Sequence, residues 1–317
     1  MADSSSGRVA ERKRHSPLVD SLIRLVKEKP LGTVGGIITL LLLLAGIFAD
    51  FLAPYGINET HLADTLAPPS IKFWLGTDSL GRDLFSRVIF GARISVIVGL
   101  SASIIATIIS TVVGGLSGYI GGKFDLIVQR FVDVWMCLPS LVFLLVLISM
   151  IGPGLPQVIF AMGLRWGVGG SRIIRSAVIA IKENVYVEAA KAIGCPTHWI
   201  LIRHILPNIM APLITLFSIR VPNAILTEAT LSFLGFGIPP PAPSWGGMLS
   251  GEGRTYMFLA PWIVIWPGLA LSTVVYGVNM FGDAVRDLLD PRMRGGIGRY
   301  GVRAEKKKFW GESGGKR

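Results

Sequence analysis

The chain has 317 residues, of which 51% are hydrophobic and only 16% are charged, and its formal net charge is +11 at pH 7. Soluble domains usually carry about 25% charged residues. Here the apolar residues form long blocks without helix or strand spacing, which excludes an ordinary soluble enzyme. The basic residues flank those blocks, a pattern that the positive-inside rule of membrane proteins explains better than nucleic-acid binding does.

The predicted elements begin with a polar, basic segment, residues 1–30, in which 17–29 has the pattern of an amphipathic helix on the membrane surface. The first apolar block starts near Leu31 and is longer than a signal-peptide core, so we expect a retained span. A helical crossing needs about 20 residues. By that measure the sequence predicts an all-α integral membrane protein with about six spans, at 31–52, 94–115, 131–151, 155–174, 207–231 and 258–281.

These spans divide the chain into four parts. We expect a cytoplasmic N-terminal segment (1–30), a first span with an external segment (31–93), a five-span core (94–282) and a cytoplasmic basic tail (283–317). The core contains a polar helical loop, 175–207. With both ends inside, 24 of the 31 lysine and arginine residues lie on the inner side and 5 on the outer side. Both termini are therefore predicted to be cytoplasmic.

Several patterns of catalytic or metal-binding proteins are present only in part. Gly115-Leu-Ser117-Gly118 matches the GxSG of intramembrane serine proteases, but the histidines that follow it, His198 and His204, fall in or beside a cytoplasmic loop. Glycines at 114, 118 and 122 instead favour a flat face for close helix packing. Gly121-Gly-Lys123 lacks the full phosphate-loop pattern, and neither the two cysteines nor the four histidines have metal-ligand spacing. No cofactor or metal is predicted, and an enzyme is the weaker interpretation.

The loop 175–207 has the pattern of a bent helical hairpin. Apolar residues at 174, 178, 181 and 185 repeat at helical spacing. Glu188-Ala189-Ala190 then leads to Gly194, which allows a sharp change of direction, and Pro196 suits the first turn of a new helix. Such a hairpin, joined to the fifth span, could transmit a push from a soluble partner. An ordinary surface helix with a glycine cap is the alternative.

Charged residues within predicted spans are a second signal. Arg220 and Glu228 lie in the fifth span, and Asp133 opens the third. Ionisable groups in a bilayer usually face the bundle interior or a water-filled path, so Arg220 and Glu228 are candidates for lining or gating a pathway. They could equally pair with a partner subunit or snorkel from a span end. In the external segment, Asp78, Arg82, Asp83 and Arg87 either hold a helix turn or touch an external protein.

The hairpin motif and five further segments resemble one known family. Glu188-Ala189-Ala190, Gly194 and Leu206-Pro207 resemble the EAA loop of ABC importer permeases, with His204 where the general pattern has isoleucine. Arg203-His204-Ile-Leu-Pro207-Asn208 is similar to the version in the dipeptide/oligopeptide/nickel permease family. Further blocks in register resemble the C-type member of its paired permeases: Leu75-Gly-Thr-Asp78, Gly81-Arg-Asp83, Thr227-Glu-Ala229, Pro243-Ser-Trp-Gly246 and Leu289-Asp-Pro-Arg292.

The resemblance implies a type I importer permease in a prokaryotic inner membrane. It implies a second homologous permease as heterodimer partner, two cytoplasmic ATP-binding subunits and an external substrate-binding protein, with ATP hydrolysis in the partners. It also implies that Glu188, Ala189, Ala190 and Gly194 couple the spans to the ATPases, and that the substrate is a peptide or similar small solute. Three rivals remain at this stage. The first is a secondary transporter driven by an ion gradient, which calls for an inverted repeat that the sequence does not display. The second is an intramembrane protease centred on Ser117, and the third is a structural or signalling subunit, which would tolerate disruption of Gly194.

Overall fold

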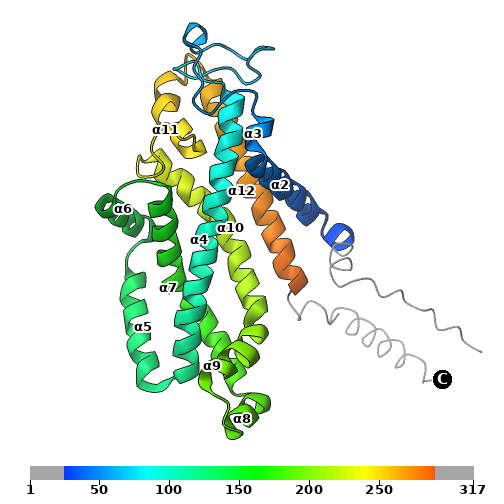
Figure 1. Cartoon of the computed structure of the whole chain (residues 1–317), viewed down its shortest axis with the longest axis vertical. Coiled ribbons are helices and arrows are strands. Elements are labelled where there is room, and N and C mark those ends of the chain that lie inside the picture. The colour runs from blue at the N-terminus through cyan, green and yellow to red at the C-terminus, as the bar shows by residue number, and fades with distance from the viewer. Residues whose placement is uncertain (1–24, 290–317) are drawn as a thin grey trace, which may run out of the picture.

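The computed structural model describes residues 25–289, and that part of the chain is helical and contains no strand, which confirms the predicted all-α class (Figure 1). The α-helices are α2 (Pro30–Ile47), α3 (Ala49–Leu52), α4 (Leu84–Ile120), α5 (Gly122–Cys137), α6 (Ser140–Ile151), α7 (Leu155–Lys182), α8 (Val185–Ala192), α9 (Thr197–Ile200), α10 (Met210–Phe233), α11 (Trp245–Tyr256) and α12 (Trp262–Leu289). The tighter or wider helical turns are η1 (Leu62–Asp64), η2 (Leu201–Ile205) and η3 (Leu206–Ile209).

Two predictions fall largely outside the described residues. The amphipathic helix expected over 17–29 is described only in its last turn, 25–28, which is helical. The basic tail is described only as far as Leu289, and there it continues α12. The expected boundary between core and tail at residue 282 therefore lies inside a helix.

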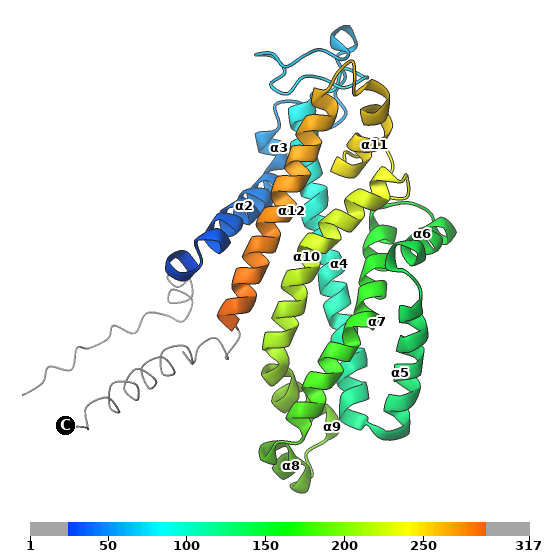
Figure 2. The same ribbon diagram turned by 180° about the vertical axis from the view of Figure 1, so that it is seen from behind.

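Helices α4, α7 and α10 run side by side through the middle of the molecule, with α2 and α12 on one flank and α5 and α6 on the other (Figures 1 and 2). Helix α11 and residues 53–83 lie at one end, and α8 and α9 lie at the opposite end. The side chains of α2 are apolar on its outer side too, with Leu40 and Leu41 exposed. A helix that is apolar all round is typical of a membrane span.

In the described residues, four helical stretches are long and apolar enough to cross a membrane: α2, α4, the stretch Thr197–Phe233 and α12. A fifth span results if α5 and α6 are counted together. The fourth predicted span, 155–174, is the first part of α7, which is long enough but carries Arg165, Arg172, Arg175 and Lys182. The structure therefore supports four or five apolar spans, and the sixth expected segment is a helix with a more polar composition.

The third predicted span, 131–151, is not one straight helix. Helices α5 and α6 meet at an angle of 90°. Leu138, the C-cap of α5, is extended at φ −79° and ψ 134°. Pro139 follows it, and a proline disfavours helical geometry in the residue before it and cannot donate a backbone hydrogen bond. The expectation of one helical span was wrong here, because the span was assigned from its apolar residues and the effect of Pro139 was not considered.

Glycines bring α4 and α7 into backbone contact. A Cβ at Gly114 would overlap the carbonyl oxygen of Ser171, and one at Gly118 would lie 2.9 Å from the carbonyl oxygen of Arg175. From the other side, a Cβ at Gly167 would lie 2.6 Å from that of Ile109. The predicted packing face is confirmed for Gly114 and Gly118. It is wrong for Gly122, which has open space around it and a φ of +56° at the turn into α5.

Candidate functional site

The loop 175–207 folds as the expected hairpin at the end of the molecule opposite α11 (Figures 1 and 2). Helix α8 ends near Gly194, whose φ of +81° lies in the left-handed region that glycine adopts without cost. The amide nitrogens of Gly194 and Cys195 donate to the carbonyl oxygens of Lys191 and Ala190, both at 3.0 Å, and so close the helix end. Pro196 is the N-cap of α9. The predicted change of direction at Gly194 is confirmed.

The inner side of the hairpin is anchored in one apolar cluster shared with the long helices. Its buried members are Val187, Ala190, Ile200, Ile205, Ile209 and Leu213 from the hairpin and α10, together with Tyr119, Ile174 and Val178 from α4 and α7. Ala190 is buried because a small side chain fits against these neighbours, whereas Glu188, Ala189 and Gly194 are exposed. Since one cluster joins α8 to α7 and α10, a force on the hairpin reaches both helices through packed side chains.

The outer side of the hairpin carries large apolar side chains. Val185 is 80% exposed and Ile193 is 81% exposed, and Tyr186, Trp199 and Ile202 are exposed as well. Val185 is the last of the apolar residues that repeat at helical spacing in the sequence, and it does not pack with Ile174 and Val178 because α7 ends at Lys182. A cluster of exposed apolar residues is typical of a contact surface for another protein or for the membrane. Sequence reasoning missed this surface because periodicity alone does not distinguish it from a core.

Polar contacts tie α5 to α7 just above the hairpin. The guanidinium of Arg175 donates to both carboxylate oxygens of Asp125, in one case at 2.6 Å from Nε. This hydrogen bond raises the pKa of Arg175, which lies beyond the predicted fourth span. Ser117 donates to Asp125 and accepts from Gln129 at 3.0 Å. Within the described residues Ser117 has no histidine partner, so the geometry gives the protease alternative no support.

Arg220 lies between α4, α7 and α10 and is 7% exposed. Its Nη2 donates to Ser110 Oγ at 2.8 Å and to the carbonyl oxygen of Trp166 at 3.0 Å, and its Nη1 donates to Thr107 Oγ1 at 3.4 Å. Gly170 provides the room, because a Cβ there would overlap Nη2 of Arg220. The guanidinium is thus enclosed by three helices of this chain and connects them by hydrogen bonds.

Glu228 lies further along α10, toward α11, and is 1% exposed. Its Oε1 accepts from Ser232 Oγ at 2.7 Å, and Ser232 in turn accepts from the amide nitrogen of Ile238 at 3.3 Å. Among residues 25–289 no cation lies within ion-pair distance of its carboxyl group. Arg220 and Glu228 are therefore not brought together: each has its own partners. Asp133, the third charge of the predicted spans, pairs with Arg172 and Arg130.

The four charged residues before and at the start of α4 hold a turn, one of the two roles that the sequence left open. Asp83 caps α4 by accepting from the amide nitrogen of Ser86 at 2.8 Å. Asp78 accepts from Nε of Arg82 at 2.6 Å, and Nη2 of Arg82 donates to Glu252 of α11 at 2.8 Å. Arg87 lies 3.5 Å from the same Asp78 carboxylate. These contacts fix residues 77–87 against α11.

The sequence and fold were compared with those of known proteins. Residues 110–295 match the family model described as binding-protein-dependent transport system inner membrane component, and residues 16–69 match the N-terminal TM domain of oligopeptide transport permease C. The chain is 36% identical, over 92% of its length and 95% of the relative's, to the oligopeptide transport system permease protein OppC of Bacillus subtilis (strain 168). It is 39% identical, over 88% and 91% of the two lengths, to the dipeptide transport system permease protein DppC of Alkalihalophilus pseudofirmus. A solved chain of the inward-facing MetNI methionine ABC transporter is similar with a TM-score of 0.47 at 16% identity, over 64% of this chain and 96% of that chain.

Proposed function

Because the chain belongs to the family of binding-protein-dependent transport system inner membrane components, we propose that it forms half of the pathway of an ATP-driven importer for peptides or similar small solutes. It is a multi-pass inner-membrane permease subunit of a bacterial transporter family. Its partners in this proposal are a second permease, two cytoplasmic ATPases and an external binding protein. The chain itself performs no bond chemistry, and ATP is hydrolysed by the ATPases.

The observation that carries the proposal is the hairpin α8–α9. It protrudes at one end, presents Glu188 and Ala189 beside an apolar outer surface, and is packed through Ala190 onto α7 and α10. A soluble ATPase that holds the outer surface can therefore move two long helices at once. In this proposal Glu188, Ala189, Ala190 and Gly194 couple ATPase closure to the spans, and the hairpin end is the cytoplasmic end. The lysine and arginine bias then favours cytoplasmic termini.

Arg220 and Glu228 support switching in different ways. The bonds of Arg220 to α4 and α7 favour a role as a lock that keeps these two helices and α10 together when the hairpin moves, rather than as a lining group of the path. Glu228 has no cation within ion-pair distance in the described part of the chain, and it is close to the outer turn through Ser232 and Ile238. We propose it as the gate residue of the pair, since a buried carboxyl without a counter-ion is sensitive to helix movement.

The coupling role is tested by substitution of Gly194 in the reconstituted importer with all its subunits. Valine strains the left-handed backbone by about 1–2 kcal/mol or more, whereas asparagine tolerates it better. No atom lies within 4 Å of a Cβ at this position, so side-chain bulk is not the cause of any difference. We expect Gly194→Val and Glu188→Lys to assemble but to lose peptide uptake and its link to ATP hydrolysis, while Gly194→Asn keeps both. Substrate-stimulated hydrolysis and uptake at the normal ratio in Gly194→Val would contradict the proposal.

Two of the rival functions make different predictions. An ion-gradient transporter would continue uptake after the ATPases are disabled, and the proposal predicts that uptake stops. An intramembrane protease would lose its function in Ser117→Ala without losing assembly. We expect that variant to retain uptake, because Asp125 keeps both bonds to Arg175 when the serine hydroxyl is removed.

A further inference from the structure

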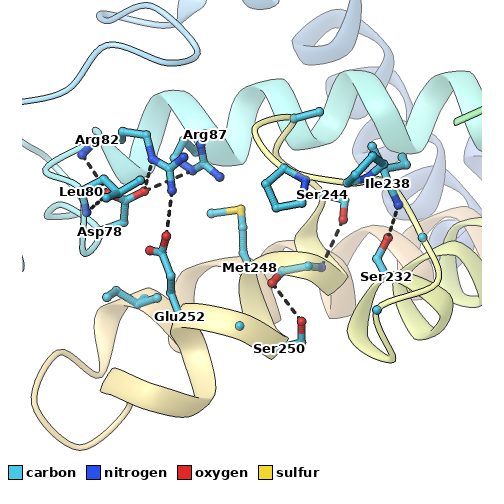
Figure 3. A pocket seen from close by; sticks show the side chains of 18 of the residues that line it. Asp78, Leu80, Arg82, Arg87, Ser232, Ile238, Ser244, Met248, Ser250 and Glu252 are labelled. Carbon is cyan, nitrogen blue, oxygen red and sulfur yellow. Dashed lines mark hydrogen bonds and ion pairs between the residues drawn. The ribbon is translucent and has the colours of Figure 1, made fainter. Parts of the chain in front are cut away.

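A cavity of about 340 Å³ lies at the outer end of the molecule, opposite the hairpin. It is formed between the turn before α4, the start of α4, the linker between α10 and α11, and α11 itself (Figure 3). Much of its wall is apolar, from residues Leu80, Leu84, Ile238, Pro239, Pro240 and Met248. Ligand sites range from about 300 to 1,000 Å³, so this cavity fits only a small molecule or one end of a larger one.

Most polar side chains in the wall already have hydrogen-bond partners within the chain. The carboxylate of Asp78 accepts from Arg82, and that of Glu252 accepts from Arg82 and from the amide nitrogen of Ser79. Ser244 accepts from the amide nitrogen of Gly247, and Ser250 donates to the carbonyl oxygen of Gly247. These groups shape the cavity and leave few sites for a ligand.

Arg87 is the exception. It lines the cavity and its side chain is 9% exposed, yet its Nη1 has no hydrogen-bond partner among the described residues (Figure 3). Among the buried side-chain atoms of the described wall, it is the one left without a bond. Its Nε lies 3.5 Å from an Asp78 oxygen that Arg82 already holds at 2.6 Å. The guanidinium of Arg87 therefore borders the cavity with donor capacity that the described residues do not use, which suits the site to an acceptor.

The charges and apolar residues around Arg87 favour a ligand that carries one negative charge on an otherwise apolar molecule. Arg82 and Arg87 are balanced by Asp78 and Glu252, and the two carboxylates would repel a phosphate or another dianion. A carboxylate matches the guanidinium by a charge-assisted hydrogen bond, and an attached alkyl group would cover the apolar wall. Burying a fully hydrated inorganic anion beside prolines and methionine would lose its hydration without that gain.

We propose that this cavity binds the carboxylate end of a small apolar solute, chemically the C-terminal residue of a short peptide, with the guanidinium of Arg87 as the donor. It is then a binding site for the transported solute within this chain, on the outer side. The identification of the solute as a peptide rests on the proposed function, whereas recognition of a carboxylate rests on the cavity alone.

The test uses the complex of both permeases and both ATPases in lipid nanodiscs, without binding protein or ATP, and titrates it with alanyl-leucine by calorimetry. Alanyl-leucinamide removes the carboxylate, and 4-methylpentanoate keeps it without a peptide bond. Arg87→Gln removes the donor. Gly251→Leu is chosen to occlude the cavity without removing a charge, since Gly251 lines the cavity and a Cβ there meets no atom within 4 Å. Lys72→Gln and Gly251→Ala are the matched controls.

We expect saturable binding of alanyl-leucine that weakens at least tenfold in the amide, in Arg87→Gln and in Gly251→Leu, and is unchanged in both controls. If 4-methylpentanoate also binds, the carboxylate and alkyl group are the parts that the cavity recognises. If it does not bind, the cavity also requires the peptide bond. The inference is overturned if acid and amide bind equally, if Gly251→Leu binds as the unaltered chain does, or if no saturable binding occurs. ATP-driven uptake with the binding protein is measured separately: uptake without this binding would refute the cavity and leave the proposed function standing.

Discussion

Gly170 is the position where one methyl group should disturb the centre of the bundle most directly. A Cβ there would overlap Nη2 of Arg220 and would lie 2.6 Å from Oγ of Ser110. Gly170→Ala must therefore push the guanidinium away from Ser110 and from the carbonyl oxygen of Trp166. The adjacent glycine is a matched control, because a Cβ at Gly169 would come no nearer than 3.5 Å to any neighbour.

The magnitude follows from the two bonds that are lost. A hydrogen bond to a charged group contributes about 1.5–3 kcal/mol, although interhelical bonds in membranes average closer to 0.6 kcal/mol. Replacing glycine by alanine stabilises a helix by up to about 1 kcal/mol, and this gain is the same at both positions, so it cancels in the comparison. Gly170→Ala should thus be less stable than Gly169→Ala by about 1–6 kcal/mol.

The assay is thermal unfolding of the assembled importer in detergent, read from intrinsic fluorescence and from the retained complex. Arg220→Gln should be destabilised too, and the double variant Gly170→Ala/Arg220→Gln should be more stable than the sum of the single losses predicts, because the clash requires both groups. Equal midpoints for Gly169→Ala and Gly170→Ala would refute the reasoning, as would strict additivity in the double variant.

Three further predictions concern other contacts. Gly114→Leu should prevent stable assembly, because its Cβ would overlap the carbonyl oxygen of Ser171, whereas Gly115→Leu has open space and should assemble; the yield of the purified complex distinguishes them. Asp125→Asn should leave Arg175 without its carboxylate partner and lower the midpoint of unfolding, while Asp64→Asn, which affects an exposed pair with Lys72, should leave it almost unchanged. Gly91→Val should displace the indole of Trp245, whose Nε1 donates to the carbonyl oxygen of Val88 at 3.0 Å; increased proteolysis of α11 would report it, and an unaltered cleavage pattern would contradict it.

The parts of the fold that hydropathy predicts are those in which the bilayer is the dominant solvent. Helices α2, α10 and α12 lie where the apolar blocks are, because a long apolar run has few other stable conformations in a membrane. The bend at Leu138 was missed although Pro139 was visible, and helix α11 was missed because residues 245–256 are short and polar. A hydropathy profile alone therefore reveals neither the bend nor the short helix.

The candidate site divides in the same way. The turn at Gly194 follows from local chemistry, since a left-handed residue after a helix favours glycine, and it was correctly predicted. The enclosure of Arg220 could not be predicted, because its partners Ser110 and Trp166 lie more than fifty residues away in the chain. The unpaired nitrogen of Arg87 could not be predicted either, because it results from the way the Asp78 carboxylate bonds to Arg82, which only the three-dimensional structure shows.

The side of the membrane on which the hairpin lies, and what it touches there, is the most direct test of the coupling mechanism. A single cysteine at Ile193, which is 81% exposed, would be placed in an importer whose Cys137 and Cys195 are replaced by serine, with a cysteine at Ile71, 97% exposed at the opposite end, as the counterpart. Cross-linking in intact membranes should join position 193 to an ATPase subunit in a nucleotide-dependent manner, and a membrane-impermeant thiol reagent added outside should label position 71 alone. Labelling of position 193 from outside, or no cross-link to an ATPase in any nucleotide state, would contradict the account.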